Sequence, residues 1–268
     1  MKVLCIGDIC GSGGVKTLQK LLPKIKAEEK IDVTIVNGEN SADGNGVTMQ
    51  SMRDILSSGA DVITGGNHTL KRKEILEELE ANDRLLRPHN LSDKFLGKGY
   101  TVIDLGFTQL FVINLLGRVF LENIHPLYET ALNPFEVLDE LIEKAQGLGI
   151  KNIIVDFHAE ATSEKKALMF YAKDRISALF GTHTHVLTAD CDIFDGCGYI
   201  TDIGYTGSYN SVLSVKPDIS IAKIKDNANV KFENGEAPYV LSGAIFEIDN
   251  KSGRCISAKS LCYKNINL

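Results

Sequence analysis

The chain has 268 residues, of which 44% are hydrophobic and 24% charged, so it can bury a substantial core and is not a disordered protein. Lysine and arginine number 29 against 35 aspartates and glutamates, which gives a net charge of −6. This balance excludes a broad basic surface of the kind that binds duplex nucleic acid by neutralising phosphates. No Pro-rich or Ser-rich linker divides the sequence, which predicts a single domain over residues 1–268.

Hydropathy and cysteine content indicate the compartment. The N-terminal apolar run ends too soon for a signal peptide, and no stretch approaches the ~20 apolar residues of a membrane span. The 6 cysteines include no C-x-x-C pair, which argues against a structural zinc site and, in a reducing compartment, against a disulfide framework. We therefore expect a cytoplasmic protein with no membrane partner.

Short β-branched runs alternate with longer amphipathic stretches, a pattern typical of α/β folds. The predicted buried strands span residues 2–6, 33–36, 62–64, 110–114, 152–156, 178–180 and 199–201. The predicted helices span residues 15–30, 48–58, 71–82, 134–147 and 164–173. Beyond residue 219 the pattern changes, and residues 220–224, 238–248 and 255–261 are predicted to form antiparallel strands joined by turns.

Polar side chains follow five of the predicted strands, at the edge where open α/β sheets build their sites. These segments are Gly7-Asp8, Asn37-Gly38-Glu39-Asn40, Gly65-Gly66-Asn67-His68, Phe157-His158-Ala159-Glu160 and Gly181-Thr182-His183-Thr184-His185. Their carboxylates, amides and imidazoles are too many for one zinc ion and suit two borderline divalent cations. We interpret them as a two-metal site in which Glu39, on a central strand, bridges the cations and Asp8 serves one of them.

The H-x-H pair is the strongest single element of this site. His183 and His185 alternate in a segment expected to be extended, which would place both imidazoles on one face, each within reach of a different cation. The neighbouring glycines permit tight turns and a close approach of the backbone to a bound group.

Each candidate has a structural alternative when it is taken alone. Asp8 and the asparagines fit turns, and His158 fits a hydrogen-bonded core histidine. Their coincidence at separate strand ends favours the metal site. His89 and His125, each beside a proline, lack such a setting and are interpreted as structural. The glycine-rich residues 11–14 match no nucleotide-binding motif in order, although beside a cation they could help to hold a phosphate.

The strand-end series, together with the stretches at residues 158–165 and 201–207, resembles the calcineurin-like metallophosphoesterases, and more specifically the YmdB-type 2′,3′-cyclic nucleotide phosphodiesterases. The resemblance implies a four-layer α/β/β/α sandwich of two mixed sheets flanked by helices. It also implies two divalent or mixed-valence metal ions, iron or manganese foremost, although zinc accepts the same ligands.

The resemblance implies a ligand set for each metal ion. One ion would be held by Asp8, Glu39, Asn40 and His185, and the other by Glu39, Asn67, His158 and His183. His68 would be the catalytic residue that binds no metal and that stabilises or protonates the leaving oxygen.

Three positions depart from the wider superfamily. Cys10 stands in the segment Asp8-Ile9-Cys10 where the superfamily has the histidine of D-x-H, so one metal lacks a usual imidazole and Asn40 is expected to compensate. Glu39 replaces the usual bridging aspartate, and Thr69 replaces the common acidic residue after the catalytic histidine. These changes match the YmdB-type subgroup.

The resulting hypothesis is a hydrolase that converts 2′,3′-cyclic nucleotides, or related small phosphodiesters, to nucleoside monophosphates through in-line attack by a metal-bridging hydroxide. Two alternatives stay open: a phosphomonoesterase that uses the same site, and a metal- or nucleotide-binding regulatory protein without turnover. The expected partner is a small phosphodiester and not duplex nucleic acid, and a symmetric homo-oligomer is the general expectation for such a protein.

Overall fold

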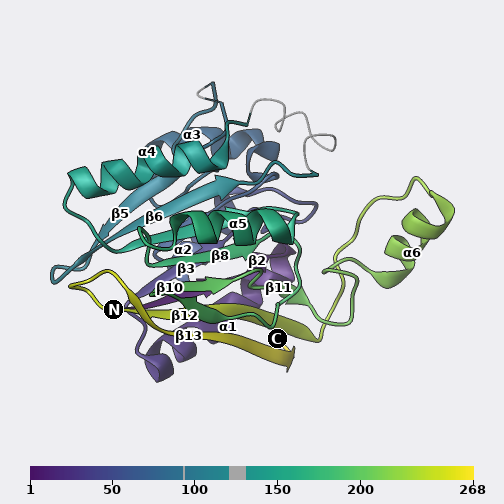
Figure 1. The fold of residues 1–268 in the computed structure, drawn as a ribbon. Helices are drawn as coiled ribbons and strands as arrows, with labels where there is room; N and C mark the ends of the chain where they lie inside the picture. Colours follow the sequence, from purple (N-terminus) through teal and green to yellow (C-terminus); the bar gives the residue numbers. More distant parts are fainter. Residues whose placement is uncertain (93, 121–130) are drawn as a thin grey trace.

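The structure is a computed structural model, and it describes residues 1–92, 94–120 and 131–268. Two mixed sheets form its centre (Figure 1). The first sheet contains β1 (Lys2–Ile6), β2 (Asp8–Ile9), β3 (Val33–Asn37), β4 (Val62–Thr64), β11 (Tyr205–Ser208), β12 (Tyr239–Ile248) and β13 (Cys255–Ile266). Its order is β2-β11-β12-β1-β3-β4, with β13 on β12. Strands β1, β3 and β4 are parallel, whereas β12 runs antiparallel to β1.

The second sheet has the order β5-β6-β7-β8-β10-β9. Its strands are β5 (Tyr100–Asp104), β6 (Gln109–Leu116), β7 (Ile153–His158), β8 (Ala178–Thr182), β9 (Asp192–Phe194) and β10 (Cys197–Ile200). Strands β6, β7, β8 and β10 are parallel, and the edge strands β5 and β9 are antiparallel to their neighbours. The parallel strands of each sheet therefore end at a common edge.

Helices cover the outer face of both sheets. These are α1 (Gly11–Glu29) and α2 (Met49–Ser57) on the first sheet, and α4 (Pro134–Gly147) and α5 (Thr162–Ala172) on the second. Alternation along β1 explains the layers: Leu4 and Ile6 pack in one core with Leu18 of α1, while Val3 and Cys5 pack in the core between the sheets. This is the expected four-layer sandwich.

Helix α4 illustrates how local sequence specifies an element. Its predicted limits match the structure, because Asn133 caps it by accepting the backbone N–H of Phe135, and Pro134 occupies the first turn. Among the described residues, no helix combines the length and the apolar character needed to cross a bilayer.

The predicted helix over residues 71–82 is wrong in its first half. The chain forms two short 3₁₀ turns, Thr69–Lys71 and Lys73–Ile75, before α3 (Leu76–Ala81). Between the two turns Arg72 is extended, and its guanidinium donates to the backbone carbonyls of Asp43 and Asn45. These contacts hold the loop after β3 and outweigh the local helical propensity.

The predicted strand over residues 220–224 is also wrong, because these residues lie within the helix α6 (Pro217–Asp226). Pro217 and Asp218 in the first turn and a left-handed Asn227 after the last turn are helix signals that the short apolar alternation concealed. Figure 1 shows α6 on a segment that projects away from the sandwich. The antiparallel pair that follows is confirmed as β12 and β13.

Candidate metal centre

The carboxyl ends of β1, β3 and β4 in one sheet, and of β7 and β8 in the other, bring the predicted ligands together. All seven predicted ligands join one network of short polar contacts that crosses from sheet to sheet: Asp8, Glu39, Asn40, Asn67, His158, His183 and His185. The five strand ends predicted to converge therefore do so.

One half of the network surrounds His158, which is fully buried at the end of β7. Its Nε2 lies 2.9 Å from Asn67 Oδ1, 3.0 Å from His183 Nδ1 and 3.3 Å from Glu39 Oε1. One ligand atom from each of Glu39, His158 and His183 falls within 4.8 Å of the others. A single proton satisfies only one of these contacts, whereas a cation among the atoms would satisfy all of them.

The other half surrounds His185. Its Nε2 lies 3.0 Å from Asp8 Oδ2 and 3.5 Å from Asn40 Nδ2. Asn40 Nδ2 in turn donates to Glu39 Oε1 over 2.9 Å, so that one glutamate oxygen contacts both halves. The other Glu39 oxygen accepts the backbone N–H of His68 over 2.8 Å. Glu39 is thus the side chain that links the two halves, as a bridging carboxylate requires.

Buried partners fix the imidazole rings. Thr182 Oγ1 donates to Asp156 over 2.7 Å and lies 2.9 Å from His158 Nδ1, so Nδ1 carries a proton and Nε2 is turned toward Glu39 and Asn67. His183 Nε2 lies 3.0 Å from Glu160, which leaves His183 Nδ1 to face His158. The two imidazole rings are therefore held with one nitrogen of each facing the other.

Charge in this cluster is arranged for cation binding. Burial would raise the pKa of Glu39, but the charge and hydrogen bond of His158, with a contribution from His68, bring that pKa well below the ordinary carboxyl value. Burial, together with the neighbouring His158, lowers the pKa of His183 to about 3. At neutral pH Glu39 is ionised and His183 is neutral, which are the forms that bind metals. Despite burial, Glu39 raises the pKa of His158, and Cys10 with Asp8 raises the pKa of His185, so a metal bound by these two imidazoles would displace protons.

Two unpaired oxygens in the half that surrounds His185 also fit a bound metal ion. Asp8 Oδ1 and Asn40 Oδ1 are buried without a hydrogen-bond partner among the described residues. A buried, unpaired carboxylate or amide oxygen is costly unless something positive satisfies it. Oxygen and imidazole donors of this kind suit borderline divalent cations.

The H-x-H segment is not extended, which corrects the prediction. Strand β8 ends at Thr182, and His183 and His185 have positive φ values of 96° and 60°. Because of these left-handed turns the two rings lie in different halves of the network, although the backbone that carries them is not the predicted one. Such conformations cost free energy in residues other than glycine and need outside support.

That support is a buried ion pair beneath the loop. Lys165 Nζ, on α5, donates to the carbonyl of Thr182 and to Asp202 Oδ2, each over 2.8 Å. The same carboxylate oxygen accepts the backbone N–H and the hydroxyl of Thr184 over 3.0 and 2.7 Å. Lys165 and Asp202 come from the stretches 158–165 and 201–207, to which the sequence had assigned no role. The two motifs thus meet to hold the H-x-H loop.

Position 66 requires glycine because the side chains of Glu39 and His158 lie close to its Cα, and not because of its backbone angles. A Cβ there would lie 2.3 Å from Glu39 Oε2 and 2.4 Å from His158 Nε2. Both distances are below contact, so any side chain would displace two candidate ligands.

Other predicted features lie apart from the network. His89 packs edge-on against Tyr100, in agreement with a structural role, and His125 lies outside the described residues. The glycine-rich stretch begins α1, where Gly11 donates its backbone N–H to the carbonyl of Asn40. It therefore borders the network but contributes no ligand side chain.

Several supporting residues were missed by the sequence analysis, namely Thr182, Asp156, Glu160, Lys165 and Asp202. Burial raises the pKa of Asp156 to about 6 against the hydrogen bonds from Thr64, Thr182 and Asn37, so this carboxylate is mainly ionised at neutral pH. Glu160 belongs to the strand-end segment Phe157-His158-Ala159-Glu160, and its position two residues after His158 was the sequence feature that could have indicated a supporting role.

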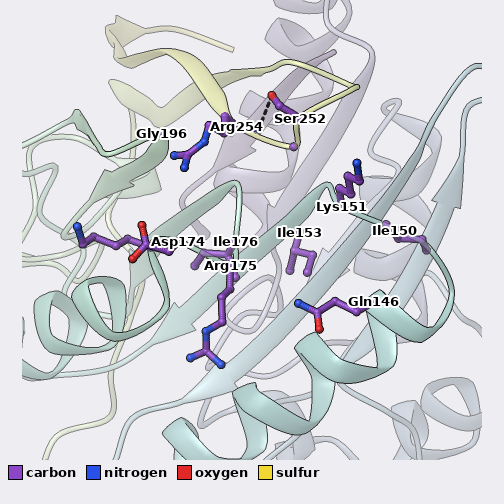
Figure 2. A pocket seen from close by; sticks show the side chains of 12 residues that line it. Gln146, Ile150, Lys151, Ile153, Asp174, Arg175, Ile176, Gly196, Ser252 and Arg254 are labelled. Carbon is purple, nitrogen blue, oxygen red and sulfur yellow. Dashed lines mark hydrogen bonds between the residues drawn. The ribbon is translucent and has the colours of Figure 1, made fainter.

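A second cavity, of about 290 Å³, lies at the opposite, amino-terminal ends of β7 and β8 (Figure 2). Of its basic side chains, Lys173 and Arg175 pair with Asp195 and Asp139. None of the seven predicted metal ligands lines this cavity, since all of them lie at the carboxyl ends of the strands.

Comparison with known proteins now identifies the family. A sequence profile described as YmdB-like protein matches residues 4–261. The chain is also 41% identical to a protein of Bacillus subtilis (strain 168), over 97% of this chain and 96% of the other. This chain belongs to the YmdB-like family. The Bacillus relative is named 2′,3′-cyclic-nucleotide 2′-phosphodiesterase.

Solved structures confirm the fold of this YmdB-like protein. A structure described as a novel phosphatase from Mycoplasma pneumoniae superposes with a TM-score of 0.92 at 33% identity, covering 100% of this chain and 94% of the other. A hypothetical protein from Thermus thermophilus gives 0.89 at 31% identity, covering 99% and 100%. The expected family and the metallophosphoesterase sandwich are both confirmed.

Proposed function

We propose that this chain is a metal-dependent phosphodiesterase that hydrolyses 2′,3′-cyclic nucleotides to nucleoside monophosphates. The observation that carries the proposal is the convergence of seven metal-ligand side chains from both sheets, two of them with buried, unpartnered oxygens. The Bacillus subtilis relative, at 41% identity, supports the choice of substrate.

The two halves of the network define which residues would hold the metals. Asp8, Asn40 and His185 would bind one ion, Asn67, His158 and His183 the other, and Glu39 both. When bound, two divalent cations such as iron, manganese or zinc supply neutralisation of phosphoryl charge and a water nucleophile at neutral pH.

The chain's own residues would hold the reacting groups in place and supply a proton to the leaving oxygen. His68 is half-buried beside the ligands, and its Nε2 lies 3.2 Å from Asn67 Nδ2. Its backbone N–H donates to Glu39 Oε2 over 2.8 Å, which anchors the main chain of His68 beside that carboxylate. We assign to this imidazole the donation of a proton to the departing ribose oxygen, a general-acid role that histidine side chains commonly fill.

Purified protein, stripped with chelator and reloaded with Mn²⁺, tests the proposal when it is given 2′,3′-cyclic AMP. Wild type should turn over only with metal, and His68→Ala should keep its metal while losing at least about 100-fold in kcat. His89→Ala is the matched control, because this half-buried histidine lies outside the network. Equal loss of metal and activity in His68→Ala would overturn the assigned role.

The phosphomonoesterase alternative is tested with the same preparations. Relative rates on p-nitrophenyl phosphate and on bis-p-nitrophenyl phosphate report whether the centre prefers monoesters or diesters. A strong preference for the monoester, together with no cleavage of the cyclic diester, would replace the proposed function. Tight metal binding without turnover of any ester would favour a regulatory protein.

A further inference from the structure

A cavity of about 320 Å³ opens directly onto the metal-ligand network and has two unlike walls. On one side lie Glu39, His68 and the H-x-H imidazoles. The facing wall is apolar, and its principal side chains are Leu213, Ile224 and Phe232. The volume is in the range of small-ligand sites, which combine apolar surface with a few polar groups.

The apolar wall belongs to the segment that projects from the sandwich, here called the α6 excursion (residues 209–235; Figure 1). Its apolar side chains are unusually exposed: Leu213 is 46% exposed, Phe232 50% and Ile224 79%. Exposed apolar side chains that are grouped beside a polar site indicate a binding surface. Single exposed apolar side chains scattered over a surface are normal and indicate nothing.

The α6 excursion is braced so that this wall is presented to the cavity. Lys216 Nζ pairs with Glu233 over 2.8 Å, and the backbone N–H of Lys216 donates to the Glu233 carbonyl over 3.0 Å. The ammonium of Lys223 lies 3.7 Å from the centre of the Phe232 ring. The Lys216–Glu233 contacts join the chain before α6 to the chain after it, and the Lys223 contact holds the Phe232 ring against α6.

Some polar atoms on this side of the cavity already have partners. Asn234 Nδ2 donates to Asp43 over 3.0 Å, and the Ser214 hydroxyl accepts the backbone N–H of Ser208 over 3.3 Å. The principal wall side chains Leu213, Ile224 and Phe232 offer a ligand apolar contact only.

We propose that the α6 excursion forms the nucleobase subsite, and that it receives the base by apolar contact with little discrimination among bases. The inference rests on the proposed function. In a 2′,3′-cyclic nucleotide the phosphate and the base project from different parts of the ribose, so a phosphate held at the network directs the base toward the facing wall. Aromatic and aliphatic surface contacts the faces of purines and pyrimidines alike.

Two substrates separate the subsite from the chemistry. 2′,3′-Cyclic AMP carries a base, whereas methyl β-ribofuranoside 2′,3′-cyclic phosphate presents the same diester without one. The quantity measured is kcat/KM for 2′,3′-cyclic AMP divided by kcat/KM for the substrate without a base. In Phe232→Ala and in Ile224→Ala this ratio should fall about tenfold, since stacking and apolar contact with the base are lost.

Ile221→Ala is the matched control, because this residue lies on the same helix, is 55% exposed and does not line the cavity. Its ratio should equal that of wild type. Wild type should also hydrolyse 2′,3′-cyclic AMP and 2′,3′-cyclic UMP with kcat/KM values within about tenfold of each other, a spread that contact area alone can produce.

An unchanged ratio in both wall variants would overturn the subsite, even if both substrates became slower. A preference of wild type for one base far beyond tenfold would also overturn it, because such selectivity requires hydrogen bonds to the base edge. Failure of wild type to cleave either cyclic diester would instead refute the proposed function on which the subsite rests.

Discussion

Replacing Lys165 with methionine should destabilise the folded chain by about 3 to 5 kcal/mol, the cost of leaving a buried charge without its partner. Lys165 and Asp202 are both fully buried, and the ammonium is 2.8 Å from the carboxylate. Methionine has a similar length, so the change removes charge and donor with little loss of volume. The Thr182 carbonyl also loses its donor, which adds to the cost.

Urea unfolding of the chelator-treated protein, followed by circular dichroism, measures this loss without a contribution from bound metal. The double variant Lys165→Met with Asp202→Asn should recover much of the stability, because the charge no longer remains unpaired. Lys24→Met is the matched control: its partner Glu28 is 3.7 Å away and both side chains are exposed, so the loss should be below about 1 kcal/mol.

The ion pair also predicts a functional effect. At temperatures where Lys165→Met stays folded, the left-handed H-x-H loop loses an anchor, so metal affinity and turnover should fall together. The reasoning would be refuted if the free energy of unfolding of Lys165→Met were within about 1 kcal/mol of the wild-type value, because an exposed ion pair contributes that much. A double variant as unstable as the single one would refute it equally.

Two further perturbations act on the metal network itself. Gly66→Ala should abolish metal binding while the fold survives, because the new methyl group overlaps Glu39 and His158. Gly147→Ala is the control, since a Cβ there meets nothing within 4 Å. Metal analysis measures the bound ions of each variant, and circular dichroism shows whether each variant is folded. Chelation should lower the melting temperature of wild type by about 5 to 10 °C if metal is present at about 100 times its dissociation constant. Gly66→Ala should show no such shift, and a shift of equal size in that variant would place the metal elsewhere.

The strand-end ligands could be predicted because their positions follow from local sequence. A buried β-branched run followed by glycine and a polar residue identifies the end of a strand, and parallel strands bring such ends to one edge. For that reason Asp8, Glu39 and His158 could be assigned to one site from the sequence alone. The limits of α4 were predictable for the same kind of reason, since Asn133 and Pro134 act on their own helix.

Other features depend on contacts between distant segments. The left-handed backbone at His183 and His185 depends on Lys165 and Asp202, which are far apart in the sequence and carry no local signal of pairing. Arg72 interrupts a helix because it binds the loop after β3. In α6, by contrast, the helix signals at Pro217 and Asn227 are local, and they outweigh the short alternation of apolar residues.

The proposed bridging role of Glu39 is central to the proposed function, and metal analysis of Glu39→Gln tests it most directly. The variant keeps the shape of the side chain and removes the charge that both halves of the network contact. Wild type loaded with Mn²⁺ should hold two ions per chain and hydrolyse 2′,3′-cyclic AMP, whereas Glu39→Gln should retain fewer than one ion and lose turnover. Two tightly held ions and undiminished hydrolysis in Glu39→Gln would contradict the account.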